Sequence, residues 1–285
     1  MYSQEITRCH RGAIVIAIDQ SCSMSGRMML KGWNLSKAEA VSMVVGQLVD
    51  ELILRSHREN VYRDYYDIAL IGYSGNEVYP LFGDELMFYP ITAFVNRNVP
   101  TTTFSLDFKT LNSSDSPFVE PVSLWVEPRA QGATPMYKMI NRVTDLVADW
   151  CSKEENMDSF PPLVFNVTDG EASDANYEML RTAAHKLRSI STTDGNTLFM
   201  NIHITSDTNH KQALFPTPHE VPLEIRHAHL MMDMSSVVPE QLHSYINRCR
   251  TSVGHPPYIA MSYNASISAL IAVLNIGSRS VLMGV

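Results

Sequence analysis

Residues 13–23 read AIVIAIDQSCS, an apolar, β-branched run that ends in a short polar segment. The unbroken apolar run from Ala13 to Ile18 is typical of a strand covered on both faces, as the strands of a parallel sheet are. Asp19, Ser21 and Ser23 follow it directly. The stretch therefore predicts a buried parallel strand whose carboxyl end carries oxygen-bearing side chains.

The rest of the chain alternates between strand and helix patterns. Strand patterns cover residues 67–73, 77–82, 163–167, 197–205 and 228–234, with 77–82 as a hairpin partner of 67–73. Helical spacing covers residues 33–55, 135–151, 239–249, 265–276 and a segment that Ser173 or Asp174 can cap. This alternation predicts an α/β fold: a doubly wound, mostly parallel sheet with one antiparallel edge strand and helices on both faces.

Residues 83–131 interrupt the alternation with several prolines, although 101–106 and 119–126 have strand character. We interpret this stretch as an elaborated insertion within a single domain that spans residues 1–285.

Composition and charge exclude several classes of function. The chain has 45% hydrophobic residues, which excludes disorder, and 30 acidic against 22 basic residues, which makes nucleic acid a poor partner. The N-terminal apolar run is too short for a signal peptide, and no later run could span a bilayer. The cysteines are widely spaced, which favours reduced thiols. We therefore expect a cytoplasmic protein that does not bind membranes.

Polar residues lie at three places where ligands bind in such sheets, beyond the carboxyl ends of the strands. One is the set Asp19, Ser21 and Ser23; the others are Thr134 in QGATPMY and Asp169 in VTDGEASD. All offer oxygen, the ligand atom that Mg²⁺ prefers, with Mn²⁺ or Ca²⁺ as alternatives. We predict a metal site on these residues, with one coordination position open.

The order Asp19-x-Ser21-x-Ser23, Thr134, Asp169 resembles the metal-ion-dependent adhesion site (MIDAS) of von Willebrand factor type A (vWA) domains. The resemblance runs from about residue 13 to 205 and is similar in style to bacterial cytosolic members. It implies a Rossmann-like vWA fold in which the two serines bind the metal directly and Thr134 does so in the ligand-competent state. The two aspartates would act through water or as hydrogen-bond acceptors. Cys22 stands where many members have Gly, and residues 83–131 have no family counterpart.

Neutral hydroxyl ligands leave positive charge on the ion, so the sequence favours a module that binds an Asp or Glu of a protein partner. No positioned base, phosphate loop or nucleophile elbow is present, which argues against an enzyme. One alternative is a Mg²⁺-dependent phosphohydrolase or phosphotransferase with Asp19 as nucleophile, although Ser21 stands where such enzymes have a second Asp. In a third interpretation, the metal only holds the loops in place.

Simpler interpretations exist for each residue. Thr134 before Pro135 can cap a helix, and the serines and Asp169 can be turn residues. His227 and His229 on a strand, with His219 nearby, suggest a zinc site. We consider surface histidines the better interpretation of that pattern, because no cysteine or carboxylate accompanies them.

Overall fold

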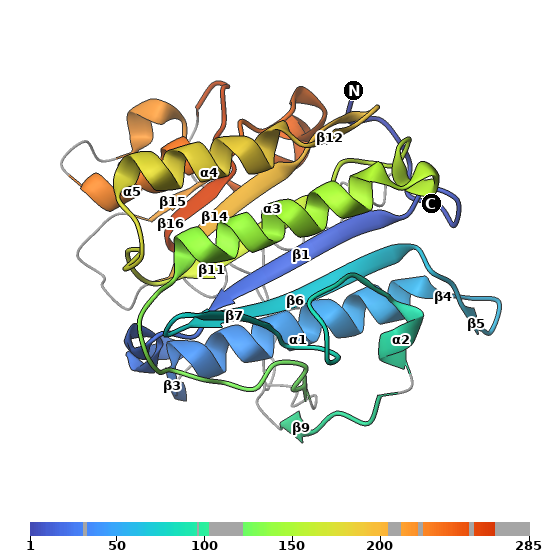
Figure 1. The fold of residues 1–285 in the computed structure, drawn as a ribbon, viewed down its shortest axis with the longest axis horizontal. Helices are drawn as coiled ribbons and strands as arrows, with labels where there is room; N and C mark the ends of the chain where they lie inside the picture. Colours follow the sequence, from blue (N-terminus) through green and yellow to red (C-terminus); the bar gives the residue numbers. More distant parts are fainter. Residues whose placement is uncertain are drawn as a thin grey trace.

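A computed structural model describes residues 1–30, 33–95, 97–102, 122–204, 212–221, 225–250 and 254–265. Its centre is an eight-stranded sheet in the order β15-β16-β14-β11-β1-β6-β7, with β8 also paired to β6 (Figure 1). The strands are β1 Gly12–Asp19, β6 Tyr66–Ser74, β7 Glu77–Pro80, β8 Tyr89–Pro90, β11 Leu163–Thr168, β14 Leu198–Ile204, β15 Ala213–Leu214 and β16 Met261–Ala265. Five of them pair in parallel, and β7, β8 and β15 are antiparallel. The doubly wound, mostly parallel sheet is confirmed, and β15 adds a second antiparallel edge that the sequence does not predict.

Helices cover both faces of the sheet. They are α1 Lys37–Ser56, α2 Thr92–Val95, α3 Met136–Ser152, α4 Tyr177–Ser189, α5 Arg226–Met234 and α6 His243–Cys249. Successive side chains of a strand point to opposite faces. Ile14 and Ile16 of β1 therefore join the core under α1 and α6, whereas Ala13 and Val15 join the core under α3, α4 and α5. This two-sided burial explains the unbroken apolar run in β1.

Short elements connect the layers. The 3-10 turns are η1 Cys22–Ser25, η2 Glu154–Asn156, η3 Pro218–Glu220 and η4 Glu240–Leu242. The small antiparallel pairs are β2 Arg27–Leu30 with β3 Trp33–Ser36, β4 His57–Arg58 with β5 Val61–Tyr62, β9 Thr101–Thr102 with β10 Val122–Ser123, and β12 Ser191–Thr192 with β13 Gly195–Asn196.

The predicted helix over 33–55 begins four residues later than expected, at Lys37, because Ser36 ends β3 and caps α1. The Ser36 hydroxyl accepts from the Glu39 amide at 3.1 Å, and the Glu39 carboxylate accepts from the Ser36 amide at 2.7 Å. This reciprocal pair is a capping box, which fixes the first turn of a helix.

The strand predicted over 228–234 is wrong, because these residues belong to helix α5. Ala228, Met231 and Met234 are buried at steps of three, which is one face of a helix. Short apolar runs do not distinguish the two structures by themselves. The fifth parallel strand is instead β16, whose last residue opens the predicted helix over 265–276; the rest of that helix lies outside the described residues.

The other predicted elements agree with the structure within a few residues. The strands over 67–73, 163–167 and 197–205 correspond to β6, β11 and β14, and the helices over 135–151 and 239–249 to α3 and to η4 with α6. Inside the predicted insertion, β9 and β10 lie within the predicted strand ranges 101–106 and 119–126; β10 ends at Ser123, and residues 103–121 lie outside the description. The cap of α4 is Asn176 rather than Ser173 or Asp174. The single domain over residues 1–285 stays a prediction.

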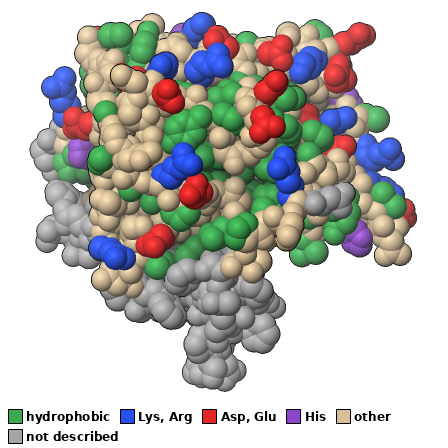
Figure 2. Space-filling model, turned by 60° about the horizontal axis from the view of Figure 1, so that its bottom comes forward, with side chains coloured by type: hydrophobic (Ala, Val, Ile, Leu, Met, Phe, Trp, Pro, Cys, Tyr) green, Lys and Arg blue, Asp and Glu red, His purple; other side chains and the backbone are tan. Residues whose placement is uncertain are grey.

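Both signs of charge are mixed on one face of the molecule. On the described part of the face in Figure 2, Lys and Arg side chains are interspersed with Asp and Glu. Phosphate backbones bind to continuous basic stripes, and this face offers none among its described residues. Within the described ranges, no helix is long and apolar enough to cross a membrane.

The connection before α3 packs closely against the turn between β6 and β7. Gly132 has a φ of +75°, and a Cβ there would lie 2.7 Å from both the Cα and the nitrogen of Gly75. Gly75 itself has a φ of +61°, but a Cβ at that position would meet nothing within 4 Å. The two glycines thus share the left-handed conformation and differ in available space.

We expect Gly132→Ala to lower the free energy of unfolding by at least about 2 kcal/mol, because it adds a backbone clash to the left-handed strain. Gly75→Ala should cost only about 1 kcal/mol, from the strain alone. Urea denaturation of both variants measures the difference. Equal losses would show that the connection moves aside without cost.

Candidate metal site

The candidate site lies at the point in the sheet where the strand order changes direction, between the parallel strands β1 and β11. β1 and β11 are neighbours, with Ile18 paired to Val167. From β1 the chain continues through α1 on one face to β6, and from β11 through α4 on the other face to β14. The crevice beyond the carboxyl ends of such a strand pair is the usual ligand position in doubly wound sheets.

Asp19 ends β1 and is completely buried, with 0% of its surface exposed. One carboxylate oxygen accepts the Ser21 amide at 2.9 Å, and the other accepts the Thr168 hydroxyl at 2.7 Å. Burial raises the pKa of the Asp19 carboxyl; the hydrogen bonds from Ser21 and Thr168 oppose the rise, and the nearby Asp169 carboxylate adds to it. The site therefore contains an acid that a bound cation would help to ionise.

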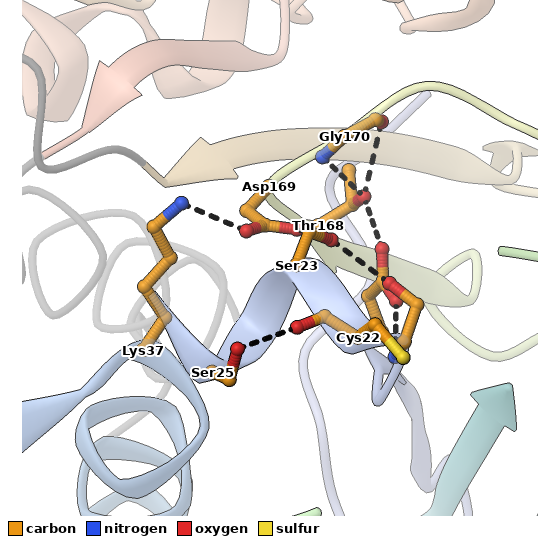
Figure 3. Close-up of polar contacts among 9 residues, drawn as sticks. Cys22, Ser23, Ser25, Lys37, Thr168, Asp169 and Gly170 are labelled. Atoms are coloured by element: carbon orange, nitrogen blue, oxygen red, sulfur yellow. Dashed lines mark hydrogen bonds and ion pairs between the residues drawn. The ribbon is translucent and has the colours of Figure 1, made fainter. Parts of the chain in front are cut away.

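Ser21, Ser23 and Asp169 form a chain of oxygens beside Asp19. Figure 3 shows the Ser23 side chain directed toward Asp169. The two serine hydroxyls are 3.0 Å apart, and the Ser23 hydroxyl donates to Asp169 Oδ1 at 2.6 Å. Bonds of about 2.1 Å from Mg²⁺ in an octahedron would place neighbouring oxygens about 3.0 Å apart. Both the chemistry and the spacing of these donors fit a small hard cation.

Lys37 also belongs to this cluster, although the sequence gives no signal for it. Its ammonium nitrogen lies 2.8 Å from Asp169 Oδ2, the oxygen that Ser23 leaves free (Figure 3). The Asp169 side chain is 0% exposed and the Lys37 side chain only 13%. The β2–β3 hairpin separates Ser23 from Lys37 in the sequence, so only the fold brings the two together.

Thr134 lies at the same edge of the sheet and is buried. Its loop is tied to the end of β1 by the Gln131 amide, which donates to the Gln20 carbonyl at 2.8 Å. The Thr134 amide donates to the Ser173 hydroxyl at 3.0 Å, and the Thr134 carbonyl accepts the Ser173 amide at 2.9 Å. Its own hydroxyl makes no hydrogen bond within the described part of the chain. The structure thus joins four predicted site residues by contacts and places Thr134 on an adjoining loop.

Thr134 is not the cap of α3. The helix begins at Met136, with Pro135 at the cap position and no side-chain capping bond from it. Asp174 accepts the amides of Tyr137 at 3.0 Å and Lys138 at 2.9 Å. Its carboxylate satisfies the first turn of α3, where negative charge is favourable, and not that of its own helix.

The two histidines predicted to share one face of a strand lie on a helix instead. His227 and His229 lie on α5, where residues two apart project from different sides of a helix. Among the described residues, no group of three or more His, Cys, Asp and Glu is arranged to hold a metal. The His227 ring instead lies 5.3 Å from that of His203 in β14, and burial lowers the pKa of His203 to about 4.

No protein-family model matches the chain, and no curated protein matches it. Among solved structures, it is similar to a von Willebrand factor type A protein from Catenulispora acidiphila, with 13% identity and a TM-score of 0.39 over 70% of this chain and 34% of that one. It is also similar to proximal thread matrix protein 1 of the mussel byssus, which has a zinc-occupied MIDAS motif, with 14% identity and a TM-score of 0.34 over 69% and 36%. Manganese-loaded TRAP protein of Plasmodium vivax gives 13% identity and a TM-score of 0.40 over 93% and 72%.

The chain spans about a third of the length of the first two of these proteins. At these identities and TM-scores, the likeness assigns no ligand or partner to this chain.

The raised pKa of Asp19 predicts how stability depends on pH without metal. Between the ordinary aspartate pKa of about 3.9 and the raised value, the folded chain binds more protons than the unfolded chain. Stability in EDTA should therefore fall as the pH rises through this window. Asp19→Asn should remove that part of the slope in thermal melts, whereas Asp84→Asn, at an exposed position, should keep it. A slope unchanged by Asp19→Asn would contradict the prediction.

Proposed function

We propose that this chain is a protein-binding module whose Mg²⁺ ion, held by Asp19, Ser21, Ser23, Thr134 and Asp169, binds an acidic side chain of a partner. The observation that carries the proposal is the 2.6 Å hydrogen bond from the Ser23 hydroxyl to Asp169. It directs the Ser23 proton to the carboxylate, so the Ser21 hydroxyl donates to the Ser23 oxygen, and one Ser23 lone pair remains for a cation. Mn²⁺ and Ca²⁺ have the same preference for oxygen and are the alternatives.

The residues divide into ligands and supports. Ser21 and Ser23 would bind the ion directly, with Asp169 behind Ser23 and Asp19 behind the Ser21 amide. Thr134 would add a further hydroxyl from its adjoining loop. Because the direct ligands are neutral, the ion keeps positive charge toward its open position. A carboxylate of a partner protein is the ligand that best matches such a position.

The surroundings of Asp19 favour binding over phosphoryl transfer. A nucleophilic carboxylate needs an oxygen that faces the substrate. Asp19 is fully buried, and both of its oxygens already accept hydrogen bonds. We therefore assign it to the support of the site. We also propose a cytoplasmic location, which the free thiols of Cys9, Cys22 and Cys151 support.

Mg²⁺ at about ten times its dissociation constant should add about 1.4 kcal/mol of stability and raise the melting temperature by about 3 °C. Ser23→Ala should abolish this shift, because it removes a direct ligand. Ser25→Ala is the matched control: it changes the same residue type in the same turn, but the Ser25 hydroxyl donates to the Cys22 carbonyl and not to the site. The same shift in both variants would overturn the proposed site.

The role of Thr134 separates partner binding from mere support of the loops. Proteins retained by the immobilised chain in Mg²⁺ should be released by EDTA, and Thr134→Ala should fail to retain them because the open position loses its neighbouring ligand. Mass spectrometry of the eluates identifies the partners. Retention by Thr134→Ala that still responds to EDTA would show that the ion only holds the loops.

A further inference from the structure

We propose that Lys37 is a built-in cation of the candidate metal site: its ammonium balances Asp169 in the metal-free protein and sets how tightly the site binds Mg²⁺. This inference rests on the proposed function. It concerns how tightly the metal binds, and it adds Lys37 to the five predicted site residues.

The contact is that of a site residue and not of a surface lysine. The Lys37 ammonium lies 2.8 Å from Asp169 Oδ2, while Asp169 Oδ1 accepts the Ser23 hydroxyl (Figure 3). Both side chains are largely or fully withdrawn from water. An ion pair in such surroundings is screened far less than an exposed one. The ammonium and a metal bound at Ser23 would therefore interact strongly.

The fold holds Lys37 in this place. Its amide donates to the Gly26 carbonyl at 2.9 Å, which joins the start of α1 to the end of η1. The capping box of Ser36 and Glu39 fixes the helical turn that follows. A cation at a helix N-terminus opposes the helix dipole. The Asp169 carboxylate, rather than the helix, therefore accounts for a buried ammonium here.

The balance of charge gives the direction of the effect. Asp19 and Asp169 are two buried carboxylates. Among the described residues, Lys37 forms an ion pair with Asp169, and no ion pair involves Asp19. These three groups sum to a formal charge of −1, so Mg²⁺ would bring the site to +1. With a neutral residue at position 37, the sum would be −2 before metal binding and 0 after it. Lys37 thus lowers the affinity for the metal and leaves the loaded site positive toward an acidic partner.

The test is isothermal titration with Mg²⁺ alone, on the full chain and its variants. Lys37→Met keeps the apolar stem and should bind Mg²⁺ at least about tenfold more tightly, a difference of about 1.4 kcal/mol. Lys37→Arg keeps the charge and should stay near the wild-type value. Lys153→Met, at the far end of α3, removes the same charge from an exposed position and should change little.

The outcomes separate this inference from the proposed function. If wild type binds Mg²⁺ and Lys37→Met binds it no more tightly, the role of Lys37 is overturned and the metal site stands. If neither wild type nor Lys37→Met binds Mg²⁺, the proposed function itself fails. Tight binding by Lys37→Met with weak or undetectable binding by wild type supports the inference.

Thermal melts give a second readout that does not need a measured dissociation constant. In EDTA, Lys37→Met should melt below wild type, because Asp169 then lacks its counter-charge. Saturating Mg²⁺ should close this gap by supplying the missing charge. An equal gap in EDTA and in Mg²⁺ would mean that Lys37 only stabilises the fold, and it would overturn the proposal.

Discussion

The hydrogen bond from the Thr168 hydroxyl to Asp19 joins the carboxyl ends of β1 and β11, and the candidate site depends on it. It exists because the two strands pair in parallel with Ile18 opposite Val167. That register places the residues after each strand side by side. A shift of one residue would turn Asp19 to the other face of the sheet and separate the two carboxylates. The register of β1 and β11 therefore fixes the relative positions of Asp19 and Thr168.

A buried carboxylate is stable only where donors or cations compensate it. Asp19 has an amide and a hydroxyl, and Asp169 has a hydroxyl and the Lys37 ammonium. Each acid thus has a different kind of compensation. Asp19 relies on neutral groups, and burial raises its pKa, whereas Asp169 relies on a full charge. Asp169 is therefore the carboxylate of the candidate site that already has a cation beside it, the ammonium of Lys37.

How much the sequence predicts depends on how far apart the interacting residues lie. β1, β6, β11 and β14 are recognisable because burial on both faces leaves a mostly apolar run, which is unbroken from Ala13 to Ile18 in β1. The positions of Asp19 and Asp169 follow from the strand ends. Lys37 is not predictable in this way, because a hairpin separates it from Ser23 in the sequence. The apolar run of α5 is too short to distinguish a helix from a strand, and the position of Asp174 in the sequence does not show that it caps α3 rather than α4.

Hydrogen bonds join the loop before α3 to the segment before α4. The Thr134 amide donates to the Ser173 hydroxyl, and the Thr134 carbonyl accepts the Ser173 amide. The Asp174 carboxylate accepts two amides in the first turn of α3. Neither segment can shift alone without breaking these bonds. A displacement of the Thr134 loop would therefore have to carry the segment before α4 with it. The two segments thus form a single hydrogen-bonded unit at this edge of the sheet, held to the first turn of α3.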